Sequence, residues 1–234
     1  MTFKIFLKSS IGQKYVMSLT GLALVAFVIV HLLGNLGLYS PESEVFNTYA
    51  HKLQGLGDFL EVAEVGLFLL FFVHLTLAIW IKIQNRSARP VTYSVSPKTK
   101  GGENQNTLAS RSMVITGVLI LAFLILHLIQ FQFGPSVEEG YVTTIAGEPA
   151  RDIYRLVKET LEQPLFAGIY MVAMLVLGLH LRHGIWSAFQ SLGLLTERNS
   201  RIFYRVALVL ALLLAFGFFL IPFWFVFGLH QVFL

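Results

Sequence analysis

The sequence has 234 residues, of which 56% are apolar and 13% are charged, and its formal net charge is +4. A soluble domain of this length could not bury so much apolar surface, so the composition excludes an ordinary soluble protein and indicates a membrane protein. The absence of cysteine excludes any cluster or cofactor that cysteine side chains of this chain would hold.

Five apolar segments are long enough to cross a bilayer, which takes about 20 residues. They cover residues 18–38, 62–83, 112–133, 164–190 and 202–227. Such continuous apolar runs predict helices, because a membrane β-barrel would show an alternating pattern. We therefore expect an all-α fold, a single membrane domain over 1–234 that is a bundle of five transmembrane helices.

The first segment contains the stretch MSLTGLALVAFVIVHL, which begins at Met17 and ends just after His31. The second segment reads HLTLAIW from His74, and a polar linker, RPVTYSVSPKTKGGENQN, follows it. Glycine and proline in this linker predict a loop.

The third segment repeats the first as MVITGVLILAFLILHL, with eight of sixteen positions identical in register. The shared positions include a threonine, a glycine and a histidine in each copy: Thr20 and Thr116, Gly21 and Gly117, His31 and His127. One apolar segment therefore occurs twice in the chain, each time with a histidine in it.

The stretch EPARDIYRLVKETLEQ, from Glu148, precedes the fourth segment and predicts an amphipathic helix at the membrane surface. The fourth segment reads HLRHGIW from His180, which matches the motif of the second segment. The fifth segment contains no histidine.

Charge predicts the orientation. The N-terminal arm and the second–third and fourth–fifth connections carry 13 of the 17 Lys and Arg but only two acids. The other two connections carry four basic residues and 11 acids. The positive-inside rule then places the N-terminus in the cytoplasm and the C-terminus outside.

The rise of about 1.5 Å per residue places the histidines at two depths. His31 and His127 fall in the outer half of parallel helices, and His74 and His180 fall in the inner half of the other parallel pair. A single membrane histidine is as often a structural hydrogen-bonding residue as a functional one, but four that are paired in depth and motif favour metal ligation. Zinc would need further ligands at these depths, whereas haem iron needs only two axial ligands from opposite sides. The pattern predicts two bis-histidine haems.

Other residues of these helices are candidates for haem contacts. Gly21 and Gly117 could admit a flat macrocycle or serve close helix packing. Ser18, Thr20 and Thr116 could donate to haem propionates or bond back to their own helix. Cations that could pair with inner propionates are Lys14, Lys82, Arg111 and Arg182.

Three histidines remain. His183 could compete with His180, but Leu77 stands at the corresponding position of the second segment, which favours His180. His51 and His230 are expected to be surface or interfacial residues.

The motifs SLTG followed by His-Leu-x-Gly-Asn-Leu, HLxxxIW and HLRHGIWSAFQSLG resemble the di-haem cytochrome b membrane anchor of succinate dehydrogenases and fumarate reductases, of the succinate:menaquinone oxidoreductase type. The resemblance implies that His31 and His127 ligate the distal haem b, and that His74 and His180 ligate the proximal one. It also implies an iron–sulfur subunit and a flavoprotein subunit with FAD as partners, and menaquinone as substrate. The complex is expected in the cytoplasmic membrane, and no nucleic-acid partner is expected.

Some fumarate reductases of this type carry a glutamate two residues before the haem ligand of the fourth segment. Here that position is Gly178, so the resemblance favours a succinate:menaquinone reductase. The sequence of this chain does not determine the direction of catalysis.

Quinone reduction needs proton donors beside a redox centre. Ten residues outward from the inner histidines lie Glu64 and Tyr170, near the outer histidine level. Glu64 is a candidate quinone proton relay, although an acid near a helix N-terminus is also favoured by the helix dipole. A quinone on the inner side, near Ser18, Lys14 and Trp80, is the alternative.

Two other functions stay open from the sequence. One is the cytochrome b anchor of another respiratory oxidoreductase, although those draw haem ligands from their last helix. The other is a haem-free transporter or structural anchor.

Overall fold

The computed structural model describes residues 5–6, 9–87 and 112–232. Within these ranges, five helical spans are long and apolar enough to cross a membrane: Ser10–Tyr39, Asp58–Ser87, Met113–Gln132, Pro164–Ser191 and Ser200–Val226. The predicted all-α membrane bundle is confirmed.

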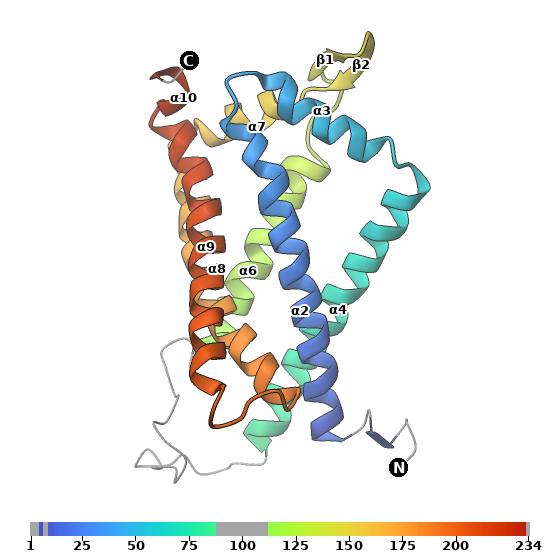
Figure 1. Cartoon of the computed structure of the whole chain (residues 1–234). Coiled ribbons are helices and arrows are strands. Elements are labelled where there is room, and N and C mark those ends of the chain that lie inside the picture. The colour runs from blue at the N-terminus through green and yellow to red at the C-terminus, as the bar shows by residue number, and fades with distance from the viewer. Residues whose placement is uncertain (1–4, 7–8, 88–111, 233–234) are drawn as a thin grey trace.

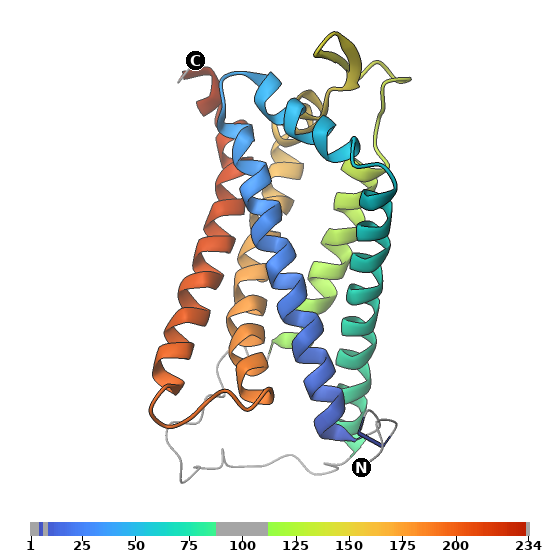
Figure 2. The same ribbon diagram turned by 45° about the vertical axis from the view of Figure 1, so that its right-hand side comes forward.

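The spans are built from α2 (Ser10–Asn35) with η1 (Leu36–Tyr39), α4 (Asp58–Ser87), α6 (Met113–His127) with the π-helical turn η2 (Leu128–Gln132), α8 (Pro164–Ser191) and α9 (Ser200–Val226). They run nearly alongside one another, with the two termini at opposite ends (Figures 1 and 2). We call the end that carries the C-terminus the outer end, following the orientation that the charges predict.

Residues at the helix starts explain where α2 and α8 begin. α2 begins at Ser10, eight residues before the predicted start, because the Ser9 hydroxyl accepts the Gly12 N–H at 3.0 Å and caps the helix. α8 begins with Pro164 in its first turn, where the missing proline N–H costs no hydrogen bond.

The bundle is tightest between α8 and α9. Small residues on α9, including Ala207, Ala211 and Ala215, are almost fully buried there. A β-carbon at Gly178 of α8 would lie 2.8 Å from that of Ala215, so these helices approach as closely as a glycine allows. α4, by contrast, has no buried residue and packs mainly on α2.

A cap of short elements covers the outer end. It contains α3 (Ser43–Gln54), the hairpin β1 (Val142–Ile145) and β2 (Glu148–Arg151), α7 (Ile153–Leu161) and α10 (Leu229–Val232) (Figure 1). Leu38 and Phe46 pack with Val157, Leu161 and Phe225 in one buried cluster. The cap therefore closes the bundle with apolar side chains of its own.

The amphipathic helix predicted from Glu148 is correct only in its second part. Residues Glu148–Arg151 form β2, and the helix begins at Ile153, because the Asp152 carboxylate accepts the Arg155 N–H at 3.0 Å as its cap. Its apolar face is buried against the bundle, so α7 belongs to the protein core at this end.

His230 was expected to be a surface or interfacial residue, and the structure shows that it is not at the surface but buried. Only 3% of this residue is exposed; its Nε2 lies 3.1 Å from Glu162 Oε1 and its ring lies 5.4 Å from that of Phe225. Gly228, with φ of +66°, ends α9 in the left-handed conformation and lets α10 turn back over the bundle. His51, as expected, is half-buried at the surface of α3.

Candidate histidine metal centres

His74 projects from α4 onto α2. Its Nδ1 lies 3.3 Å from the carbonyl oxygen of Met17 and 3.4 Å from Thr20 Oγ1. A β-carbon at Gly21 would lie 3.1 Å from His74 Cε1, closer than ordinary contact. The glycine therefore makes room for the imidazole of the neighbouring helix.

His180 projects from α8 onto α6 in the same manner. Its Nδ1 lies 3.1 Å from Thr116 Oγ1, and a β-carbon at Gly117 would lie 3.7 Å from its Cε1. The Thr-Gly pair of each repeat copy thus supports the inner histidine of the adjacent helix. His183, one turn further along α8, makes no such hydroxyl contact in the described part of the chain.

His31 and His127 meet at the outer level. Their ring centroids are 5.8 Å apart and the rings are perpendicular. His31 stacks on Phe27 at 5.4 Å and lies 5.7 Å from Phe218 of α9. Aromatic rings from two helices therefore pack against the His31 imidazole.

A tyrosine from α8 reaches the same level. Tyr170 Oη lies 3.4 Å from His127 Nδ1 and donates to Gln130 Oε1 at 2.8 Å. Tyr170 was predicted at the outer histidine level, and it lies there beside His127. Gln130 was not predicted, although two glutamines in the otherwise apolar HLIQFQF stretch were a visible signal.

The two levels follow from the register of the repeat. Thr20 and Thr116, which contact the inner histidines, each precede the outer histidine of their own helix by eleven residues. At the helical rise, this separates the levels by about 16 Å. Each level draws its two histidines from two different helices.

The chemistry of the donor sets suits haem iron. No group of three or more potential metal-ligating side chains exists among the described residues, so a zinc-type site is absent from that part of the chain. Each level offers two imidazoles, which is what a macrocycle that supplies four ligands requires. At the outer level the two imidazoles lie close together, with ring centroids 5.8 Å apart.

The predicted propionate partners are dispersed. Ser18 is buried and donates to the Lys14 carbonyl at 2.8 Å, while the Lys14 side chain is exposed. Arg182 donates to the Tyr204 hydroxyl and lies 5.6 Å from the centre of that ring. Lys82 is exposed, and Arg111 lies outside the described residues.

Glu64 lies at the outer part of α4, where its Oε1 accepts from Gln132 Nε2 at 3.4 Å. Its side chain is exposed on the surface of the bundle. It is thus linked to the helix of His127 but is not packed against either outer histidine.

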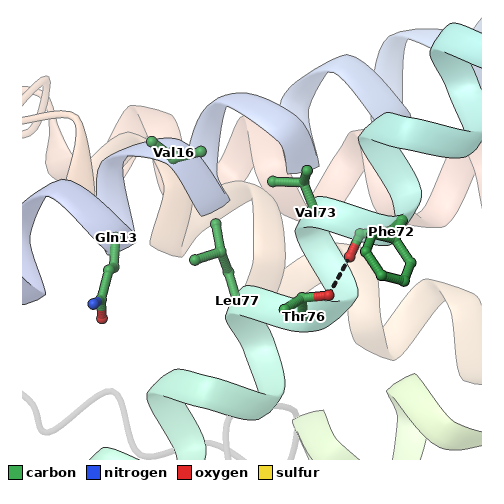
Figure 3. Close-up of a pocket in the computed structure, with 6 residues that line it drawn as sticks. All are labelled: Gln13, Val16, Phe72, Val73, Thr76 and Leu77. Atoms are coloured by element: carbon green, nitrogen blue, oxygen red, sulfur yellow. Dashed lines mark hydrogen bonds between the residues drawn. The ribbon is translucent and has the colours of Figure 1, made fainter. Parts of the chain in front are cut away.

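A recess of about 300 Å³ opens between the inner parts of α2 and α4 (Figure 3). Gln13, Val16, Phe72, Val73, Thr76 and Leu77 line it. It carries no ionisable group, and Ser18, Lys14 and Trp80 do not belong to its lining.

The family model for succinate dehydrogenase/fumarate reductase transmembrane subunits matches residues 84–220. This span includes His127 and His180, whereas His31 and His74 lie before its first residue. No curated protein and no solved structure matches the chain.

Proposed function

Because this chain belongs to the family of succinate dehydrogenase/fumarate reductase transmembrane subunits, we propose that it passes electrons through two bis-histidine b haems between an iron–sulfur subunit and menaquinone. It is a multi-pass membrane subunit of an oxidoreductase complex. Beyond this, we propose the number of haems, the identity of the quinone and the partner subunits.

One observation supports this proposal: His31 and His127 of the two repeat copies lie together, and His74 and His180 of two other helices each contact one copy at a second level of the bundle. The outer pair is 5.8 Å apart, and each inner histidine rests on a Thr-Gly pair. Chance core histidines would not repeat this arrangement in both halves.

Four residues of the chain would hold the two groups: His31 with His127, and His74 with His180. When bound, each haem would supply a one-electron carrier at its level. The chain itself orients the imidazoles. Aromatic side chains pack against His31 at the outer level, and Gly21 and Gly117 give the inner imidazoles space.

We place the quinone at the outer end. Tyr170 and Gln130 form a hydrogen-bonded pair beside His127, and Glu64 is joined to the same helix through Gln132. Among these side chains, Glu64 is the one that carries a carboxyl group, so it is the proton relay in the proposal. The lining of the inner recess offers no comparable group.

The soluble partners in the proposal are an iron–sulfur subunit and a flavoprotein subunit with FAD. They would dock on the inner face, where the basic connections lie. Succinate oxidation is the favoured direction, since position 178 is a glycine. A glutamate there would collide with Ala215 of α9 unless the two helices moved apart.

The test is the haem content of the purified complex. A reduced-minus-oxidised spectrum should show cytochrome b, and pyridine haemochrome assay should find two haems per complex. His31→Ala or His127→Ala should lose the outer haem alone, and His74→Ala should lose the inner haem alone. A wild-type complex without cytochrome b absorbance would refute the proposal and favour a haem-free anchor.

A further inference from the structure

We propose that Thr20 and Thr116 are positioning residues that hold His74 and His180 in the tautomer with the proton on Nδ1, leaving the Nε2 lone pair for the metal. The inference rests on the proposed function, because the metal is then the iron of the inner haem. It assigns to the threonine of each Thr-Gly pair a role that the repeated motif alone does not reveal.

For His74 the direction of the hydrogen bond is set by the backbone. The Met17 carbonyl oxygen, 3.3 Å from Nδ1, can only accept a hydrogen bond. Nδ1 must therefore carry the proton. Thr20 Oγ1, at 3.4 Å, is a second acceptor for the same N–H.

The hydroxyl protons point away from the histidines. Thr20 has one hydroxyl proton, and the Val16 and Met17 carbonyls compete for it at 3.0 Å each. Thr116 likewise donates to the Ser112 or Met113 carbonyl, both at 3.1 Å. Each threonine faces the imidazole with a lone pair, because its single proton is already used.

For His180 the threonine hydroxyl is the hydrogen-bond acceptor. Thr116 Oγ1, 3.1 Å away, is the acceptor for His180 Nδ1 within the described residues. The shorter distance, and the lack of a carbonyl acceptor for His180 among the described residues, predict that His180 depends on its threonine more than His74 does.

Holding the second ring nitrogen matters to a metal ligand in two ways. It prevents the tautomer in which Nε2 carries the proton and cannot bind, and it raises the basicity of the coordinating nitrogen. Removal of such a partner typically weakens metal binding about 10- to 100-fold. A less basic imidazole also stabilises ferric iron less, so the midpoint potential of the inner haem should rise.

The experiment compares Thr116→Val, Thr116→Ser and Thr20→Val in the purified complex. The readouts are haem per complex and the midpoint potential of each haem in a redox titration. Thr116→Val should weaken retention of the inner haem about 10- to 100-fold and raise its potential. Thr116→Ser should restore both, and Thr20→Val should have the smaller effect. The outer haem reports whether the bundle is folded.

Thr76→Val is the matched control. Thr76 bonds back to the Phe72 carbonyl at 2.8 Å on α4 (Figure 3), as the other threonines do on their helices, but among the described residues no hydrogen bond joins it to a histidine. It should leave both haems unchanged.

An unchanged potential and haem content in Thr116→Val would overturn the inference, and so would an equal effect in Thr76→Val. If Thr116→Val does not assemble, Thr116→Ala decides, because it removes the hydroxyl without adding apolar volume. A wild-type complex that lacks haem refutes the proposed function itself, which separates the two failures.

Discussion

The two repeat glycines allow a paired test of how tightly the inner histidines are held. Gly21→Ala places a methyl group 3.1 Å from His74 Cε1, whereas Gly117→Ala places one 3.7 Å from His180 Cε1. The first distance forces the imidazole to move by a few tenths of an ångström, and the second is an ordinary contact. The two substitutions are chemically identical, so they differ only in what the new methyl group meets.

The expected magnitudes follow from this difference. Each alanine gains up to about 1 kcal/mol of helix propensity over glycine. Overpacking at Gly21 costs about 1–3 kcal/mol, because the methyl group presses on a ring that is already hydrogen-bonded. Relative to Gly117→Ala, Gly21→Ala should therefore lose about 1–3 kcal/mol, which corresponds to roughly 5- to 150-fold in affinity for the inner haem.

The assay is loss of the inner haem from each purified variant during incubation with a haem scavenger, with the outer haem as internal reference. Gly21→Ala should lose the inner haem faster than wild type, and Gly117→Ala should match wild type or retain it longer. Equal loss in both variants, or faster loss in Gly117→Ala, would refute the reasoning that the glycine at 21 exists to seat His74.

Three further predictions follow from single contacts. His180→Ala should remove one haem by pyridine haemochrome assay and His183→Ala none; the reverse result would show that the ligand of α8 is misassigned. Glu64→Gln should cripple menaquinone turnover but spare both haems and succinate oxidation by an artificial dye, because the amide cannot titrate; normal quinone activity would remove Glu64 from the mechanism. Asp152→Ala should lower the thermal unfolding temperature, since it loses the cap of α7 and the hydrogen bond from buried Asn47 at 2.8 Å, a cost of about 1–3 kcal/mol; an unchanged temperature would mean that the cap does not contribute to bundle stability.

Local pattern was enough to predict the membrane spans and the histidine register. A long apolar run has one stable conformation in lipid, a helix, because its backbone groups find hydrogen bonds nowhere else. Once each span is a helix, the position of a histidine in the run is also its depth. This is why the repeat predicted the levels of His31, His127, His74 and His180 without any tertiary information.

The outer cap was less predictable. α3 and the β1–β2 hairpin did not emerge from the sequence argument, because their residues show neither a long apolar run nor a sustained period. His230 was misplaced for a related reason: its burial depends on the turn at Gly228 and on Glu162, which is remote in sequence.

Only the tertiary structure decided which helix supports which histidine. The sequence shows Thr20 and Gly21 as a repeated pair, but nothing local says that they face His74 of the next helix. Likewise, Arg182 is equally plausible as a propionate partner until α9 places Tyr204 against it. Helix formation depends on neighbours along the chain, so sequence reveals it. Contacts between helices depend on how the packed faces turn toward one another, and that is determined by the whole bundle at once.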